Sequence, residues 1–201
     1  ISVREKKTAE YLKGLLCKDV TCLLDPVFLL KKEEYFKLID HSLKRRKRYI
    51  YFYMLGRNDE ALSFVEKLSE YTGIEIVYDI HDKDNLFLIK RLKKYGKPVV
   101  SDGPAQFLSE IYYADCVVTN SFHGTAFSII FEKTFYTFSC VNGETNVSLR
   151  MENLLNSFSL MNRYNVETVN NIEKIDYRFA RKEIEKNKES AIEFLQNALK
   201  S

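Results

Sequence analysis

Short apolar segments alternate with amphipathic segments along most of this chain, and this alternation is what most constrains its fold. The apolar segments are rich in Val, Ile, Tyr and Phe, as strands buried on both faces are. They span residues 20–24, 49–55, 74–78, 98–101, 116–119 and 134–138. Strand–helix repetition at this spacing predicts an α/β fold, in which a parallel sheet carries helices on both faces.

The amphipathic segments between these strands predict helices. In residues 59–71, for example, the apolar side chains recur at helical spacing. The other helical segments before the last strand are 6–16, 32–43, 85–95, 104–113 and 125–132. After the last strand we expect a helix at 147–158, and a long charged helix at 176–201 that packs back across the sheet. Because the sequence has no repeat and no linker, residues 1–201 are expected to form one domain.

The composition excludes several classes of protein. Hydrophobic residues make up 45% of the 201 residues, which is enough for a buried core and excludes a disordered chain. The near balance of 31 basic and 28 acidic side chains gives no reason to expect a nucleic-acid partner. No apolar run approaches the roughly 20 residues that a membrane span requires. Residues 1–5 read as the end of a strand, so we expect an earlier half to precede them.

The four cysteines indicate buried thiols more than a metal site. None forms a CxxC pair, and the three histidines are far from them in sequence, so no metal centre is expected. Cys22 and Cys116 lie within apolar strand-like segments and are expected to be buried. This cysteine usage fits a reducing, cytoplasmic compartment.

The sharpest functional signal is the junction where the strand at 116–119 meets the next helix. The turn is filled by small or polar residues, namely Asn120, Ser121, His123, Gly124 and Thr125. Open α/β sheets bind ligands at the carboxyl ends of their strands. A helix that begins near His123 would direct its free N–H groups into that crevice and suit an anion. His123 itself suits proton transfer near neutral pH; the alternative is a histidine that only satisfies backbone groups of a tight turn.

Two further residues are weaker candidates. Arg4 ends an apolar–polar run just before a helix, and its guanidinium could clamp a carboxylate or a phosphate. The alternatives for Arg4 are a surface charge or a salt bridge with Glu5 or Glu10. Gly103 opens the helix of Pro104, and its backbone could line the same crevice, although helix capping alone explains it.

Other polar features have structural explanations. The turn at Asp25 and Pro26 is interpreted as structural, because Asp caps a turn and Pro fixes its shape. The basic run at 44–48 is interpreted as a solvated connection, with contact to an anionic glycan or a membrane surface as the alternative. His41 and His81 are expected to be exposed.

Together these residues resemble the carboxy-terminal half of the polysaccharide pyruvyl transferase family. The most specific block is Ser121-Phe122-His123-Gly124, which follows an Ala-Asp strand. All blocks, in order, are 1–5, 24–26, 103–108, 114–124, and 146–155 with Leu160 and Arg163.

The resemblance implies a fold of the GT-B type, in which two Rossmann-like halves face each other across a cleft. Residues 1–201 would be the second half, closed by the long final helix and inactive alone. Enzymes of this family act in bacterial cell-surface (exopolysaccharide) synthesis. They transfer the enolpyruvyl unit of phosphoenolpyruvate to two hydroxyls of a sugar, as a cyclic ketal, and release phosphate.

The resemblance also implies roles for the candidate residues. His123 would be the acid/base, and Arg4 matches the family position that contributes an arginine to donor binding. The helix N-terminus at Gly124 and Thr125 would hold the phosphate. Phosphoenolpyruvate is then a co-substrate, no further cofactor is implied, and the acceptor is a glycan or a lipid-linked sugar.

One position departs from the family pattern. Members often carry arginine two residues before this histidine, where the chain has Ser121. Another residue, such as Lys133 or Arg150, would have to supply that cation. Two alternatives stay open. The first is a GT-B glycosyltransferase that uses a nucleotide sugar, for which Ser121 and Glu132, nine residues after His123, leave room. The second is a non-catalytic module of a glycan-synthesis complex. A cytoplasmic location is expected, and peripheral contact with the inner face of the membrane is compatible with it.

Overall fold

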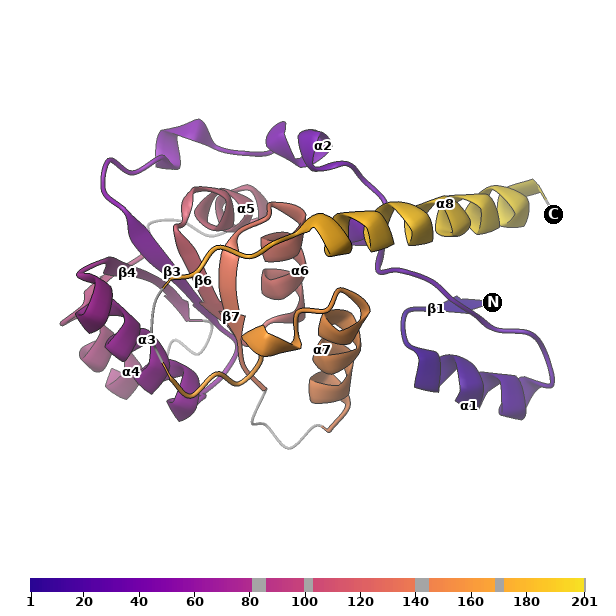
Figure 1. The fold of residues 1–201 in the computed structure, drawn as a ribbon, viewed down its shortest axis with the longest axis horizontal. Helices are drawn as coiled ribbons and strands as arrows, with labels where there is room; N and C mark the ends of the chain where they lie inside the picture. Colours follow the sequence, from indigo (N-terminus) through magenta and orange to yellow (C-terminus); the bar gives the residue numbers. More distant parts are fainter. Residues whose placement is uncertain (81–85, 100–102, 140–144, 169–171, 201) are drawn as a thin grey trace.

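The structure is a computed structural model that describes residues 1–80, 86–99, 103–139, 145–168 and 172–200. Its centre is a sheet of five parallel strands in the order β5-β4-β3-β6-β7 (Figure 1). The strands are β3 (Tyr49–Met54), β4 (Glu75–Ile80), β5 (Gly96–Pro98), β6 (Cys116–Thr119) and β7 (Thr134–Thr137). Each strand predicted after residue 48 overlaps one of these, although residues 100 and 101 lie outside the described part.

The strand order reverses in the middle of the sheet. The chain begins the sheet at β3, adds β4 and β5 on one side, and then returns to add β6 and β7 on the other. The strand order therefore reverses between β3 and β6, which are paired through contacts such as Tyr53 with Thr119. Ligands of open α/β sheets bind beside the carboxyl ends of the strands at such a point. This topology confirms the Rossmann-like fold.

Helices cover both faces of the sheet, as predicted. One face packs against α3 (Asp59–Thr72) and α4 (Leu86–Leu92), and the other against α5 (Pro104–Tyr113) and α6 (Phe122–Ile130). Successive side chains of a strand point to opposite faces. Tyr49 and Tyr51 accordingly belong to the α5/α6 core, whereas Ile50 and Phe52 belong to the α3/α4 core. All four are almost fully buried.

Capping residues set where the helices that follow β3 and β6 begin. The Asn58 side chain accepts the Ala61 N–H at the start of α3. The apolar pattern alone predicts that α6 begins at residue 125. The Ser121 hydroxyl accepts the Gly124 N–H, however, and α6 begins at Phe122. Both helices therefore direct their N-termini toward the carboxyl edge of the sheet.

A second, smaller sheet lies apart from the first (Figure 1). Its two parallel strands are β1 (Ser2–Val3) and β2 (Thr21–Cys22), and α1 (Lys6–Leu16) connects them. Both residues of β2 are exposed. The prediction that Cys22 is buried was therefore wrong, because its strand belongs to this small sheet of two strands and not to the buried large sheet. Cys116, in the large sheet, is fully buried.

The predicted helix at 32–43 is broken into short turns. The segment from β2 to β3 contains η1 (Pro26–Phe28), α2 (Lys32–Phe36) and η2 (His41–Leu43). Asp40 starts η2, because its carboxylate accepts the Ser42 N–H. Its own N–H donates to Ser109 on α5, which directs the chain away from a continued helix.

The last helices are α7 (Thr145–Ser157) and α8 (Arg178–Lys200), with η3 (Met161–Arg163) between them. Near the start of α8, Ala180 joins the α5/α6 core and Arg181 pairs with Glu132. The helix then extends beyond the large sheet toward β1 (Figure 1). There Ala191 and Leu195 line a hollow with residues of β1 and of the segment after β2. The long helix is therefore present, but it does not pack back across the sheet as expected.

Candidate functional site

Asn120 joins the two strand ends at the point where the strand order reverses. Its carboxamide oxygen accepts the Leu55 N–H at 2.8 Å, and its nitrogen donates to the Leu55 carbonyl at 2.8 Å. The side chain is almost completely buried. Sequence reasoning offered Asn120 as an anion-binding residue, but the structure uses its amide to fix the turn after β6 against the turn after β3.

The hydroxyl groups of this turn are also used within the fold. Ser121 caps α6 through the Gly124 N–H at 3.3 Å, and its own N–H donates to Thr119 at 3.0 Å. The Thr125 hydroxyl lies 3.1 Å from the Ser121 carbonyl and 2.9 Å from the Thr137 hydroxyl. Thr125 has no exposed surface. Ser121 and Thr125 therefore shape the turn, and neither directs its hydroxyl into solvent.

Gly124 is required for packing between α6 and β6. A Cβ atom at this position would lie 2.8 Å from the Thr119 hydroxyl oxygen, closer than real Cβ contacts. The sequence suggested that this glycine lets the backbone approach a ligand. The group that approaches it here is Thr119 of the neighbouring strand.

What the turn offers a ligand is the first turn of α6. Within the described residues, the N–H groups of Phe122 and His123 have no hydrogen-bond acceptor, in contrast to those of Ser121, Gly124 and Thr125. The N-terminus of a helix attracts anions through such groups and through its dipole. The His123 side chain is exposed beside them, and its ring centroid lies 5.5 Å from that of Phe122.

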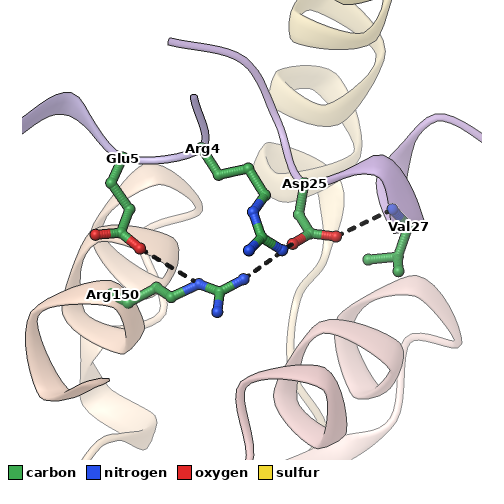
Figure 2. A network of polar contacts seen from close by, with 5 residues as sticks. All are labelled: Arg4, Glu5, Asp25, Val27 and Arg150. Carbon is green, nitrogen blue, oxygen red and sulfur yellow. Dashed lines mark hydrogen bonds and ion pairs between the residues drawn. The ribbon is translucent and has the colours of Figure 1, made fainter. Parts of the chain in front are cut away.

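Arg4 forms its ion pair with a residue far away in sequence. Its Nη1 lies 2.5 Å from Oδ2 of Asp25, so the expected partners Glu5 and Glu10 were wrong. Asp25 also accepts the Val27 N–H at 3.2 Å, which confirms its predicted role in the turn. Figure 2 shows that the Asp25 carboxylate lies between these contacts and a second guanidinium, that of Arg150 on α7.

Arg150 connects this network to the histidine-bearing helix. Its Nη2 lies 3.1 Å from Oδ2 of Asp25, and its guanidinium carbon lies 3.9 Å from the centre of the Phe122 ring. A cavity of about 430 Å³ is lined by Arg4, Asp25, Phe122 and Arg150, among other residues. His123 follows Phe122 but does not itself line this cavity. Arg4 and Phe122, the first residue of the helix that carries His123, thus line the same cavity.

The carboxyl edge of a Rossmann-like sheet, a histidine at a helix N-terminus and a paired arginine agree with the family that the sequence suggested. A family model described as polysaccharide pyruvyl transferase matches residues 1–141. The chain belongs to the polysaccharide pyruvyl transferase family. Its general role is therefore that of a transferase acting in polysaccharide pyruvylation. A comparison with curated proteins gives no match.

The pyruvyl transferase match includes Arg4, Asp25 and the whole turn at 120–125, whereas Arg150 lies beyond it. The sequence offered Lys133 as another source of a cation. Lys133 precedes β7 at the opposite, amino edge of the sheet, where it donates to the Tyr112 carbonyl and burial lowers the pKa of its ammonium group. Arg150 is therefore the one of these two cations that lies near the turn.

The residue that favoured a nucleotide-sugar transferase is also distant from the turn. Glu132 follows the far end of α6, nine residues after His123, and forms an ion pair with Arg181 at 2.7 Å. A helix rises 1.5 Å per residue, so about 13 Å separates the two backbone positions. Glu132 and His123 do not form one site.

Gly103 lies at the same edge of the sheet, at the start of α5. It caps α5 with a φ of 138°, a conformation that side chains rarely adopt. Its carbonyl accepts the Phe107 N–H, and the Phe107 ring packs 6.0 Å from that of Phe127, one turn after His123 on α6. Gly103 thus shapes the neighbouring helix start.

The basic run at 44–48 is mostly exposed, as predicted, and only Arg45 is partly buried. Arg45 pairs with the buried Glu110, and Arg48 pairs with Asp115 at 2.7 Å. The remaining cations of the run are exposed. His41 is exposed, as predicted, and contacts the Tyr113 hydroxyl, whereas His81 lies outside the described residues.

Neither a metal cluster nor a membrane-spanning helix occurs among the described residues. No three or more His, Cys, Asp and Glu side chains gather there in a way that could hold a metal ion. No helix in the same part of the chain is both long and apolar enough to span a bilayer.

Proposed function

We propose that this chain binds phosphoenolpyruvate and contributes the acid/base for transfer of its pyruvyl group to a sugar as a ketal. The observation that carries the proposal is the pair of guanidinium groups, from Arg4 and Arg150, in a cavity that shares Phe122 with the His123 turn. Phosphoenolpyruvate carries a phosphate and a carboxylate, and guanidinium groups bind both kinds of anion well. The acceptor that we propose is a glycan or a lipid-linked sugar in the cytoplasm.

The reaction needs one proton to be moved to carbon. Protonation of the methylene group turns it into a methyl group and leaves C2 electrophilic, so that one sugar hydroxyl adds to C2 and loses its proton. The bond between C2 and the phosphate oxygen then breaks, phosphate leaves, and the second hydroxyl closes the ketal with loss of its own proton. One of the two hydroxyl protons balances the methyl group, and the other leaves with phosphate.

His123 is the residue that we assign to this proton transfer. Its imidazole is exposed at the N-terminus of α6, beside the N–H groups of Phe122 and His123. Histidine can donate and accept protons near neutral pH. In the same turn, the backbone N–H groups suit the phosphate oxygens, so that acid and leaving group would meet at one helix end.

The test is turnover by the full-length protein with phosphoenolpyruvate and a sugar acceptor, followed by phosphate release. His123→Ala should lower kcat by roughly 100- to 10,000-fold, the usual contribution of a positioned acid/base. His41→Ala is the matched control, because His41 is also exposed but lies on η2. Near-normal turnover by His123→Ala would refute the acid/base role.

Calorimetry separates the donor classes. The proposal requires the wild-type protein to bind phosphoenolpyruvate. Binding of a UDP-sugar, without binding of phosphoenolpyruvate, would identify a glycosyltransferase instead. If neither donor bound while the protein copurified with glycan-synthesis enzymes, a non-catalytic module would be indicated.

A further inference from the structure

Two guanidinium groups converge on one buried carboxylate at the edge of the cavity. Arg4 and Arg150 both contact Oδ2 of Asp25, at 2.5 and 3.1 Å, while Oδ1 accepts the Val27 N–H (Figure 2). The Asp25 side chain is only 4% exposed. A single negative charge thus holds two positive ones, and the three side chains together retain a net positive charge.

Arg150 has donors left over after this contact. A guanidinium offers five N–H groups, and one of them is used by Asp25. Its Nε lies 3.5 Å from Oε1 of Glu5, an ion pair that is longer than a hydrogen bond. Within the described residues this buried Nε has no hydrogen-bond partner. Glu5 therefore neutralises Arg150 without occupying its donors.

The orientation of Arg150 is fixed from a second side. Its guanidinium lies 3.9 Å from the centre of the Phe122 ring, within the range of a strong cation–π contact. The Phe122 ring holds one face of the guanidinium, and Asp25 holds one edge. The orientation of the remaining N–H groups is therefore set before a ligand binds. Such preorganisation favours binding, because little side-chain entropy is then lost.

The cavity beside these groups is small, and the described residues that line it include three cations and three carboxylates. Its volume of about 430 Å³ is at the small end of the range for ligand pockets. Lys6 adds a third cation to its lining, and Asn153 and Asn187 add neutral polar groups from α7 and α8. Glu5 and Glu183 also line it, so an entering anion has to replace or avoid a carboxylate.

We propose that Arg150 is a donor-binding residue, which forms a clamp with Arg4 on the phosphate and the carboxylate of phosphoenolpyruvate, and that Glu5 is its displaceable counterion. Asp25 is the positioning residue for both arginines. This inference rests on the proposed function and deepens it. The family match ends at residue 141, before α7, and does not include Arg150.

The experiment measures KM for phosphoenolpyruvate, kcat and calorimetric affinity in the full-length protein. Arg150→Gln should raise KM and weaken binding by roughly 10- to 100-fold, the effect of losing one charged hydrogen bond, with kcat changed much less. Arg150→Lys should give a KM and an affinity between those of the wild type and of Arg150→Gln, because lysine keeps the charge but lacks the planar guanidinium. Glu5→Gln should act in the opposite direction and tighten binding by about 2- to 10-fold, since a competing charge is removed.

The matched control is Arg91→Gln. Arg91 also pairs with a largely buried carboxylate, that of Glu66, and also lies over a phenylalanine ring, that of Phe87, but on the other face of the sheet. Its loss should leave KM unchanged. Thermal unfolding of each variant shows whether the fold is intact, and Glu5→Gln supplies the test if Arg150→Gln does not fold.

The outcomes separate the two proposals. If wild-type protein binds and uses phosphoenolpyruvate, but Arg150→Gln leaves KM unchanged or Glu5→Gln weakens binding, the clamp is refuted and the proposed function stands. If the wild-type protein neither binds nor uses phosphoenolpyruvate, the proposed function fails and the clamp fails with it.

Discussion

Asn120 and Leu55 exchange two hydrogen bonds, one in each direction, across the point where the strand order of the sheet reverses. The turn after β6 therefore depends on the turn after β3 for its position. Because His123 follows three residues later, the orientation of the proposed acid/base depends on this amide.

Replacement of Asn120 by alanine should both lower the stability of the protein and displace the turn that carries His123. We expect Asn120→Ala to lower the free energy of unfolding by about 1–3 kcal/mol, because it removes both hydrogen bonds to Leu55, an exposed residue that water can reach. Urea unfolding measures the loss of stability, and kcat measures whether His123 is still in position. Asn162→Ala, at an exposed position on η3, should change neither. Full stability of Asn120→Ala would show that the two bonds contribute little.

Gly124 gives a prediction with a built-in control of opposite sign. Gly124→Ala should destabilise the protein by about 1–3 kcal/mol, because its Cβ would lie 2.8 Å from the Thr119 hydroxyl and force β6 and α6 apart. Gly14 lies inside α1 with nothing within 4 Å of an added Cβ. Gly14→Ala should therefore stabilise the protein by about 0.5–1 kcal/mol. Equal shifts in thermal unfolding for the two variants would contradict the packing role.

The buried Glu110 should make stability depend on pH. Burial raises the pKa of its carboxyl above the ordinary value of 4.5, and Arg45 opposes that shift only in part. The folded state then binds a proton more readily than the unfolded state. The stability from this group is thus greatest below pH 4.5 and is lost as the pH rises through the higher folded pKa. Urea unfolding of wild type and Glu110→Gln between pH 4 and 8 should show a difference that changes with pH in this direction; a constant difference would exclude it.

The thiols should differ sharply in reactivity. Cys17 and Cys22 are exposed, whereas Cys116 is fully buried and burial raises its pKa to about 12. A thiol reagent at neutral pH should therefore modify Cys17 and Cys22 in the native protein and reach Cys116 only after unfolding. Mass spectrometry of the modified peptides decides this. Rapid labelling of Cys116 in the folded protein would show that β6 opens.

The elements best predicted from sequence are those whose signals are local. The ends of α1 and α5 and of β6 agree with the expected ranges. Pro104 marks the start of α5, and an apolar run makes up most of β6. The segment 32–43 did not follow its helical pattern, because a contact from Asp40 to Ser109 on another helix redirects the chain. Periodicity alone carries no information about such a partner.

The candidate site divides in the same way. The turn with His123 could be found from sequence, since strand, cap and helix are contiguous. The roles of its neighbours could not, because the bonds of Asn120 and Thr125 end on other strands. Arg150 and Asp25 are 125 residues apart, and no local pattern indicates that they meet.

The cavity beside Asp25 is built from segments that belong to different parts of the molecule. Arg4 follows β1 of the small sheet, Phe122 begins α6 on the large sheet, and Arg150 comes from α7. A ligand that contacts all three would link the small β1–β2 sheet to the large sheet and its helices. Its binding free energy would then be added to the cohesion of the two parts, and saturation with donor would raise the temperature at which they separate.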